Sequence, residues 1–365
     1  MLLQTNSLFK NSLDKKCYFC QNFCLVKIRD IELGDKPLFL APMEDITDPS
    51  FRYICKKFGA DMMYTEFISS DGLIRDGKKS VAKLDIFDYE RPVGIQIYGN
   101  DVESMVEAAK LVEQANPELL DINFGCPVRK IAGRGAGSGI FNNIPLMIEI
   151  TKRIVEAVKI PVTVKTRLGY DETNKPIYDV AEMLQDQGIE ALTIHGRTRA
   201  QMYKGNADWT LIGEVKNNPR MKIPIIGNGD ITTPEEAKQA FDRYGVDAIM
   251  IGRGAVGRPW IFRDIKEYLK TGIVPNPLTI NEKVDLAILH LQKSLERKGD
   301  RTGIFEMRRH FSTYFKGLPN FKETRLKLVT EKDPDVIVDI LKSIKDKYKD
   351  FPQDHESGKS EYFKY

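Results

Sequence analysis

The stretch that decides the fold is Leu119-Leu-Asp-Ile-Asn-Phe-Gly-Cys-Pro127. An apolar run of strand length ends in a glycine, and a single cysteine and a proline follow directly. Continuous apolar runs of this length are typical of parallel strands that are buried on both faces. The pattern predicts a strand whose carboxyl end carries the thiol of Cys126, and α/β enzymes gather their catalytic groups at such ends.

Similar runs recur along the chain and alternate with helical patterns. The predicted strands are residues 38–43, 60–67, 93–98, 119–124, 162–167, 191–195, 223–228 and 248–252. The predicted helices are residues 48–57, 101–112, 144–158, 177–187, 209–216, 233–241 and 259–269. This alternation predicts a (β/α)8 TIM barrel, and an open doubly wound sheet is the lesser alternative because it usually has fewer units.

The alternation of strand and helix patterns stops at both ends of the predicted barrel. Residues 1–30 show no helical or strand period, so we expect residues 1–35 to form a poorly ordered extension. The barrel would occupy residues 36–272, and a linker would lead to a smaller all-helical domain at residues 279–351, with a flexible tail at 352–365. The helical part contains 16 Lys and Arg against 12 Asp and Glu, a local excess of positive charge.

Composition places the chain among ordinary globular proteins, with 42% hydrophobic and 29% charged residues. We expect no membrane segment and no secretory signal, because the apolar runs are only of strand length. Five cysteines, an odd number, favour a reducing compartment, so a cytoplasmic protein is expected. We also expect a monomer, since the sequence implies no protein partner. A net charge of +3 permits a nucleic-acid partner without requiring one.

Three of the cysteines, Cys17, Cys20 and Cys24, lie close together near the N-terminus. They lack a fourth ligand, and no histidine is near them in the sequence. An iron–sulfur cluster with one coordination site left open is one interpretation, but we favour the interpretation that these cysteines bind no metal.

Polar or glycine-rich features end nearly every predicted strand. In a barrel these tips share one mouth, so they predict a shared active site. The tips are Pro42-Met43-Glu44-Asp45, Glu66, Gln96, Asn123 with Cys126, Lys165 with Arg167, His195 with Arg197, Asn228-Gly229-Asp230 and Gly252-Arg253-Gly254. From residue type alone, Cys126 can be an acid, a nucleophile or a packing residue. Lys165 can form a Schiff base or hold an anionic oxygen.

The last two tips predict a phosphate site. Residues 228–234 and 251–255 each run from a strand into a helical start and contain glycines, and one of them contains an arginine. Backbone N–H groups in such loops bind phosphate, and barrels often use the loops after strands seven and eight. The alternative is that the glycines only serve tight turns.

Taken in order, these motifs resemble the tRNA-dihydrouridine synthases, and in particular their main bacterial branch. The matching segments are Ala41-Pro-Met-Glu-Asp-Ile-Thr-Asp48, Asn123-Phe-Gly-Cys-Pro127 and residues 94–98, 164–169, 194–198, 203–209, 227–230, 251–254, 307–310 and 314–319. The resemblance covers residues 36–330, and residues 1–35 have no counterpart in it. Glu44 replaces a small residue expected at its position, so its contact with a cofactor would be by backbone.

The resemblance implies FMN in the barrel mouth, NADPH or NADH as reductant, and tRNA as substrate. Cys126 takes the position of the catalytic cysteine. The implied cofactor-binding residues are Pro42, Met43, Glu44, Gln96, Lys165, His195, Asn228, Gly229, Asp230, Gly252 and Arg253. The expected substrate-binding residues are Asn123, Arg129, Lys130, Arg167, Arg197, Arg308, Arg309 and Lys316.

The implied reaction reduces the C5=C6 bond of a uridine in tRNA to 5,6-dihydrouridine. Hydride passes from FMN to C6 and a proton passes from Cys126 to C5, while Asn123 holds the uracil edge. Three alternatives stay open: an FMN-dependent barrel oxidoreductase acting on a free pyrimidine, a Schiff-base lyase using Lys165, and a non-catalytic RNA-binding module.

Overall fold

The computed structural model describes residues 25–349 and residue 351, and their central element is a parallel barrel. Its strands are β3 (Leu38–Leu40), β4 (Met63–Tyr64), β5 (Ile68–Ser69), β6 (Val93–Tyr98), β7 (Leu119–Phe124), β8 (Val162–Arg167), β9 (Ala191–His195), β10 (Ile225–Asn228) and β11 (Ala248–Ile251). Each strand from β6 to β10 pairs in parallel with the next, and β11 pairs with β3. A parallel bridge between Phe39 and Met62 closes the ring, which confirms the predicted (β/α)8 barrel.

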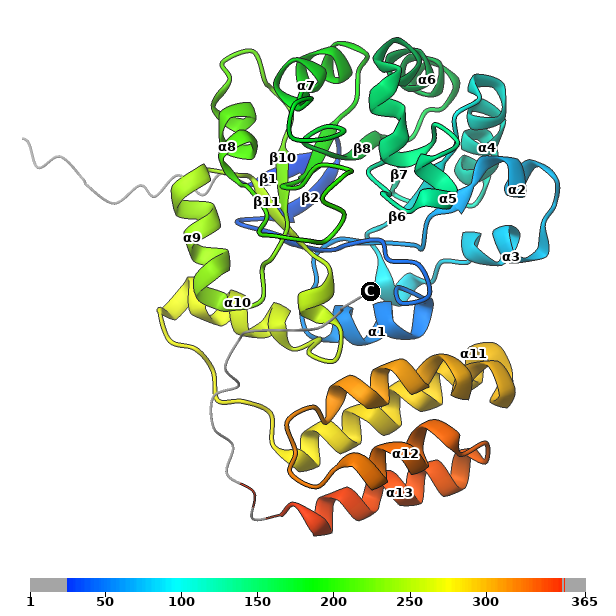
Figure 1. Ribbon diagram of the computed structural model, residues 1–365, viewed down its shortest axis with the longest axis vertical. Coiled ribbons are helices and arrows are strands. Elements are labelled where there is room, and N and C mark those ends of the chain that lie inside the picture. Colours follow the sequence, from blue (N-terminus) through cyan, green and yellow to red (C-terminus); the bar gives the residue numbers. More distant parts are fainter. Residues whose placement is uncertain (1–24, 350, 352–365) are drawn as a thin grey trace, which may run out of the picture.

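Helices surround the strands, as Figure 1 shows. They are α1 (Pro49–Lys57), α2 (Ser70–Ile74), α3 (Lys78–Val81), α4 (Val102–Gln114), α5 (Arg129–Ala132), α6 (Ile144–Ala157), α7 (Ile177–Asp186), α8 (Thr210–Asn217), α9 (Pro234–Tyr244) and α10 (Ile261–Thr271). Side-chain caps fix several of their starts: Asp48 accepts from the Phe51 amide, and Thr233 forms a capping box with Glu236. These caps place each helix start at the end of a barrel loop.

The second predicted strand, residues 60–67, is wrong in its extent. Only Met63–Tyr64 and Ile68–Ser69 pair with β6 as strand residues, and the regular pairing stops after the Thr65 amide donates to the Gly94 carbonyl at 3.0 Å. There the Thr65 hydroxyl oxygen accepts from the Gln96 amide at 3.4 Å, in place of a backbone carbonyl. The Glu66 carboxylate accepts from the Asp45 amide at 2.5 Å, which brings Glu66 towards the loop that follows β3.

The prediction of a poorly ordered extension at residues 1–35 is wrong for residues 25–35, which contain two strands. They form an antiparallel hairpin of β1 (Val26–Ile28) and β2 (Ile31–Gly34). Val26, Ile28 and Leu33 are buried against residues that begin the barrel strands, including Leu119 and Ala191. Strands of three and four residues are too short to show a hydrophobic period, so no sequence pattern predicts them. The predicted cysteine triplet at 17, 20 and 24 lies outside the described residues, as does the predicted tail.

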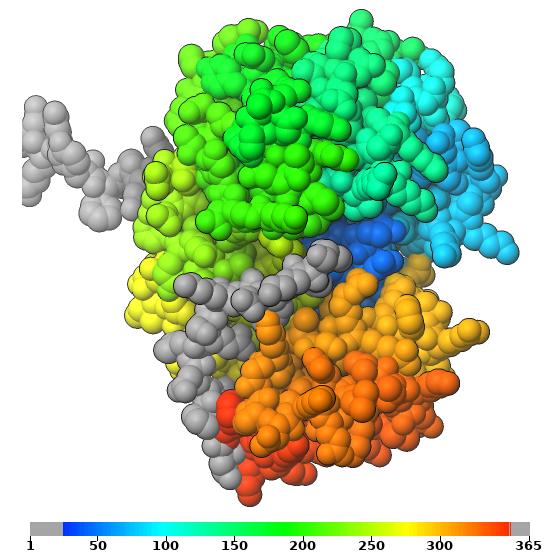
Figure 2. All heavy atoms as spheres, in the orientation of Figure 1, coloured from blue at the N-terminus to red at the C-terminus, as the bar shows by residue number. Residues whose placement is uncertain are grey.

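Helical segments follow the barrel in the described residues and pack beside it. They are α11 (Ile280–Tyr314), in which two helices meet at the non-helical Gly299 and fold back so that His290 contacts Tyr314, α12 (Lys322–Thr330) and α13 (Pro334–Lys347). Figures 1 and 2 show this helical segment against the side of the barrel that carries α1. Ile54 of α1 and Trp260 belong to the same apolar cluster as Phe311 and Leu341, so the two parts share a core. In the described part of the chain, no helix has both the length and the apolar character to cross a membrane.

Candidate active site at the barrel mouth

A cavity of about 900 Å³ opens at the carboxyl ends of the barrel strands, and we call it the mouth cavity. All the residues expected to bind a cofactor line it: Pro42, Met43, Glu44, Gln96, Lys165, His195, Asn228, Gly229, Asp230, Gly252 and Arg253. Asn123, Cys126, Arg167 and Arg197 line it as well. The volume falls in the range of small-molecule and cofactor sites.

Cys126 follows β7 directly and lies in the cavity wall, with 8% of its surface exposed. Its amide donates to the Asn123 side-chain oxygen at 2.9 Å, and its carbonyl accepts from the amide and hydroxyl of Ser138. A Cβ atom at Gly137 (φ +53°) would lie 2.7 Å from that carbonyl, so only glycine allows this close packing. Burial raises the pKa of the Cys126 thiol, which therefore stays protonated at neutral pH.

Lys165 and His195 form the polar floor on the next two strands. Burial first, and then the charge of Arg167, lower the pKa of Lys165 to about 8. Among the described residues, none forms a hydrogen bond or ion pair with its ammonium group. Burial and the neighbouring cations also hold the pKa of His195 well below its usual value, so its ring is neutral. The Arg197 guanidinium lies 3.2 Å from Nε2 of His195, which makes that nitrogen the acceptor and leaves the proton on Nδ1.

Arg167 and Arg197 lie in the cavity wall but are almost fully buried. Arg167 donates to the carbonyls of Gly125, Thr198 and Met202 at 2.7–3.0 Å. Arg197 donates to the carbonyls of Lys204 and Gly205 and pairs with Asp230. In the structure both guanidinium groups hold the loops around the mouth. The substrate contact expected of them stays a prediction.

The loops after β10 and β11 approach each other closely. Asp230 accepts from Arg197 at 2.6 Å, from Arg253 at 3.1 Å and from the Ala207 amide at 2.7 Å. A Cβ atom at Gly254 would lie 2.3 Å from the Ile231 carbonyl, so this glycine is needed for the approach. The carboxylate of Asp230 therefore orients two arginines, and Arg253 is the cation that faces the cavity beside the glycines.

The remaining predicted substrate residues lie outside the mouth cavity. Arg129 and Lys130 are exposed on α5, directly after the cavity residues Pro127 and Val128. Arg309, on α11, donates to the Asp45 carbonyl at 2.6 Å and so joins the helical segment to the rim. Arg308 lies on the next position of α11, and Lys316 is exposed just after that helix.

Tyr203 is a cavity residue that was absent from the predicted set. Its ring lies 5.1 Å from the guanidinium of Arg253 and 5.6 Å from that of Arg167. It belongs to the loop after β9, where the sequence shows no apolar period that would predict a strand or helix. The only sequence signal for this residue is its place in the matching segment 203–209. Met202 and Val128, both more than two-fifths exposed, also line the cavity and add apolar surface.

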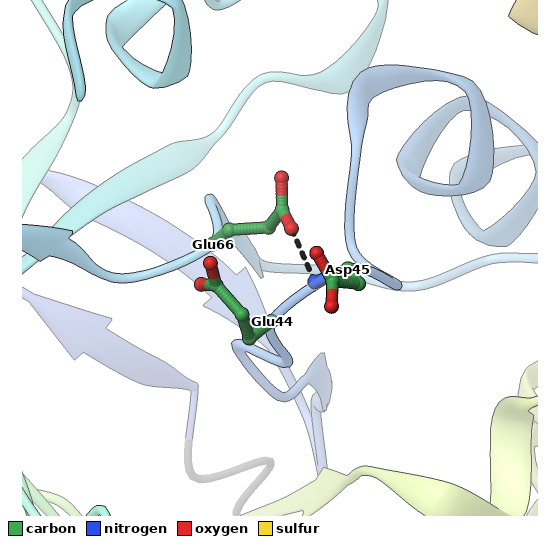
Figure 3. Close-up of side chains that lie close together, drawn as sticks. All are labelled: Glu44, Asp45 and Glu66. Atoms are coloured by element: carbon green, nitrogen blue, oxygen red, sulfur yellow. Dashed lines mark hydrogen bonds between the residues drawn. The ribbon is translucent and has the colours of Figure 1, made fainter. Parts of the chain in front are cut away.

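An acidic cluster stands at one edge of the mouth. Figure 3 shows Glu44, Asp45 and Glu66, whose carboxylate oxygens lie within 4.8 Å of one another. Lys83 pairs with Glu44 at 2.6 Å. Burial, together with the charge of Glu44, raises the pKa of Glu66 to about 7 although Lys83 opposes the shift. The side chain of Glu44 is thus engaged with Lys83 on the rim, in keeping with a cofactor contact through its backbone.

Comparison with known proteins agrees with this geometry. The family model described as dihydrouridine synthase matches residues 39–350. A probable tRNA-dihydrouridine synthase of Rickettsia conorii is 39% identical over 311 residues, covering 85% of this chain and 93% of the relative. A tRNA-dihydrouridine synthase B of Pseudomonas putida is 41% identical over 290 residues, covering 79% and 85%.

Solved structures with low sequence identity share the fold. Histamine dehydrogenase from Rhizobium sp. 4-9 matches with a TM-score of 0.53 at 12% identity, and 2-naphthoyl-CoA reductase matches with 0.54 at 13%. The matches cover 74% and 67% of this chain, which spans about half the length of each of these two proteins. They support the barrel architecture alone. The family model and the relatives carry the assignment, and the chain belongs to the dihydrouridine synthase family.

Proposed function

We propose that this protein is a flavin-dependent tRNA-dihydrouridine synthase that uses FMN, takes reducing equivalents from NADPH, and reduces the C5=C6 bond of a uridine in tRNA. The observation that carries the proposal is the protonated, largely buried thiol of Cys126 in the same cavity as the ammonium of Lys165, which has no hydrogen-bond or ion-pair partner among residues 25–349 and 351. Family membership and the names of the relatives support the choice of substrate. A tRNA substrate would place the enzyme in the cytoplasm.

The residues of the mouth cavity fit FMN. Its volume of about 900 Å³ accommodates a flavin with room for a base. Pro42, Met43 and Met250 supply apolar wall for a ring system, and Lys165 supplies a cation that has no partner among the described residues. Arg253 and the glycines at 252 and 254 would hold the phosphate, since backbone amides beside an arginine suit an anion.

When bound in its reduced form, FMN supplies the hydride that C6 of the uracil ring accepts. The protein must then deliver a proton to C5, where negative charge develops as the C5=C6 bond is lost. The Cys126 thiol would do so, and the rise of its pKa on burial, which keeps the proton available, supports this role. The thiolate left behind lies near Arg167 and Lys165, whose positive charges favour it.

The base must leave its stack to reach Cys126, and the surface around the mouth fits an RNA backbone. Arg129 and Lys130 stand on one side of the opening, and Arg308 and Arg309 stand on the helical segment beside Asp45. Phe305, which is 65% exposed, lies under the guanidinium of Arg308 at 5.7 Å and offers a flat surface next to positive charge. Aromatic and arginine side chains of this kind stack on unpaired bases.

The experiment is a reduction assay with the purified, FMN-loaded protein and tRNA that lacks the modification, with dihydrouridine measured by mass spectrometry of digested RNA. We expect a yellow protein, NADPH-dependent product in tRNA, and little product from Cys126→Ala. Free uridine reduced as fast as tRNA would favour the free-pyrimidine alternative. A colourless protein, even after incubation with FMN, or full turnover by Cys126→Ala, would overturn the proposal.

A further inference from the structure

A buried carboxylate lies directly beneath the mouth cavity, on the same strand as Asn123. Asp121 is 1% exposed and is paired across the sheet with Gln96 on β6 and Thr163 on β8. One carboxylate oxygen accepts from the Gln96 side-chain amide at 2.6 Å, and the other accepts from the Thr163 hydroxyl at 2.5 Å. Asp121 is not among the residues lining the cavity, so it acts only through its neighbours.

From Asp121 towards Cys126, each hydrogen bond is donated by the next residue to the one before it. Gln96 gives an amide hydrogen to Asp121 and accepts, through its oxygen, from the Asn123 amide at 2.9 Å. Asn123 in turn accepts, through its own oxygen, from the backbone amides of Gly125 and Cys126, both at 2.9 Å. The chain therefore leads from a buried carboxylate to the backbone of the thiol-bearing loop in three steps.

Only one orientation of each amide satisfies this chain. If the Gln96 amide were flipped, its oxygen would face the Asp121 carboxylate and its NH2 group would face the NH2 group of Asn123. If Asn123 were flipped, its NH2 group would face two backbone N–H groups. Both ends of the chain have a fixed character: the ionised carboxylate can only accept, and the backbone amides of Gly125 and Cys126 can only donate. The two ends impose the same direction, and Asp121 fixes it at the Gln96 end.

The ionisation state of Asp121 is consistent with a carboxylate that only accepts hydrogen bonds. Burial raises its pKa to about 6, while the bonds from Gln96 and Thr163 and the charge of Lys165 oppose the rise. Asp121 is therefore mostly ionised at neutral pH. Lys165 on β8 is the strand neighbour of Asn123, as Thr163 is of Asp121. The charge of the Lys165 ammonium favours the ionised form of the Asp121 carboxylate.

We propose that Asp121 is a positioning residue: it fixes which atoms Gln96 and Asn123 present to the mouth cavity and holds the Cys126 loop in place. The proposal rests on the proposed function, because Gln96 and Asn123 are expected to face the flavin and the uracil. With this orientation, Gln96 keeps one amide hydrogen and one oxygen lone pair for a ligand, and Asn123 keeps one amide hydrogen.

The test compares Asp121→Asn with the double variant Asp121→Leu/Thr163→Val, and uses Thr163→Val alone as baseline. Asparagine can accept from Gln96 through its oxygen and donate to Thr163, so it keeps the direction of the chain without the charge. The double variant removes the carboxyl and the hydroxyl together. The Thr163 hydroxyl is then not left buried without a hydrogen-bond partner, which helps the protein to fold. Thermal melting of each holoenzyme verifies folding.

Three quantities are measured on the FMN-loaded variants: kcat with tRNA, the visible absorption bands of the bound flavin, and the rate at which iodoacetamide alkylates Cys126. For Asp121→Asn we expect kcat within about 3-fold of wild type and an unchanged spectrum. For the double variant we expect kcat to fall about 10- to 100-fold, with shifted flavin bands and a changed alkylation rate, because misplaced groups lose rate of this order.

The outcomes separate the inference from the proposed function. Wild-type protein without bound flavin or product would refute the proposed function itself. An active wild type with an equally active double variant would refute the positioning role. Equal loss in Asp121→Asn and in the double variant would also refute it, because charge and not hydrogen-bond direction would then be responsible. If the double variant fails to fold, Gln96→Met, which cuts the link between Asp121 and Asn123, must still change the alkylation rate of Cys126, and an unchanged rate would refute the positioning role.

Discussion

The ammonium of Lys298 lies 3.0 Å from the carboxylate of Asp48, and this pair joins the helical segment to the barrel. Asp48 is also the residue that caps α1, and Lys298 makes a second ion pair with Glu306. Although burial opposes it, the charges of Lys298 and His290 lower the pKa of Asp48 to about 2. The joint therefore combines a helix cap, an ion pair and the neighbouring imidazoles of His290 and His310, whose rings lie 4.5 Å apart.

The first prediction concerns acid stability. Burial lowers the pKa of His290 from 6.5 to about 4, despite the opposing charge of Asp48. A histidine with a depressed folded pKa binds fewer protons when folded, so its contribution is complete above pH 6.5 and is lost as pH falls towards 4. We expect wild type to lose roughly 3 kcal/mol of unfolding free energy from this group across that window. Urea denaturation at several pH values measures the loss.

The matched variant for this prediction is His290→Gln, which cannot titrate and can still accept a hydrogen bond from Tyr314. In wild type, Nδ1 of His290 lies 2.9 Å from the Tyr314 hydroxyl. The variant should be less stable at pH 7.5 but should show a flatter dependence on pH. Parallel curves for the two proteins between pH 6.5 and 4 would contradict the role of this imidazole.

A second prediction addresses the proton donor. Cys126→Ala should lower the rate of tRNA reduction by about 10²- to 10⁴-fold, the usual contribution of a general acid. Flavin binding should be retained, because the backbone bonds of residue 126 to Asn123 and Ser138 do not involve the thiol. Cys126→Ser, which keeps the shape but is a weaker acid, should fall between the two. Single-turnover assays measure these rates, and a serine variant as fast as wild type would exclude thiol acidity as the cause.

Lys165 gives the third prediction, which concerns alkaline pH. Its pKa is lowered to about 8, mainly by burial, so its positive charge is lost as pH rises through that value. If the charge holds an anionic group, the reduction rate should decline above pH 8. Lys165→Arg should be slower at neutral pH but flat from pH 7 to 9.5, since arginine does not deprotonate there. The pH–rate profile of both proteins provides the measurement, and the same decline in both would assign it to another group.

The fourth prediction concerns RNA binding. Arg129→Gln or Lys130→Gln should weaken tRNA binding and reduce the slope of log K against log salt by about one, because each would remove one phosphate contact. Lys159→Gln is the control, since Lys159 is exposed in the loop that Arg29 contacts, at the other end of the barrel. Filter binding between 50 mM and 200 mM salt yields the slopes. A control variant that behaves like Arg129→Gln would point to general charge and not to this rim.

Finally, the hairpin before the barrel should be part of the stable fold. Ile28 is fully buried, so Ile28→Ala should cost about 2–5 kcal/mol of unfolding free energy. Lys27→Ala, on the exposed side of the same strand, removes only a surface ion pair with Glu32 and should cost less than about 1 kcal/mol. Chemical denaturation of both variants compares the two costs, and similar stability for both would mean that the hairpin only rests on the surface.

The sequence predicted the barrel well where strands are continuous apolar runs. The bounds of β6, β7, β8 and β9 agree with the predicted runs, because strands buried on both faces leave no other pattern. The second strand is shorter than predicted because the Thr65 hydroxyl takes the Gln96 amide that the ladder would otherwise use, and Glu66 bonds to the Asp45 amide outside the sheet. Such bonds depend on residues distant in the chain and have no local signature.

The candidate site was predictable by residue type but less so by role. Polar tips at strand ends predicted most of the side chains that share the mouth, since the carboxyl ends of parallel strands converge, but Asp45 and Glu66 do not line the cavity and Tyr203 lines it from a loop. What each side chain binds could not be read from the sequence. Arg167 is bonded to three carbonyls of the surrounding loops, and Asp121, inside an apolar run, is the anchor of an amide chain. Both roles depend on strand register, which only the three-dimensional structure provides.

The hairpin of residues 26–34 has a kinetic consequence. It covers the amino-terminal end of the barrel, where Arg29 bonds to the Lys159 carbonyl and to Glu190 in the loops before β8 and β9. In the described residues the mouth cavity therefore opens at the opposite end, and under the proposed function the nicotinamide donor and the RNA base would share this entrance and occupy it in turn. Initial-rate measurements with both substrates varied should then give parallel double-reciprocal lines, the pattern of a double-displacement enzyme whose first product departs before its second substrate arrives.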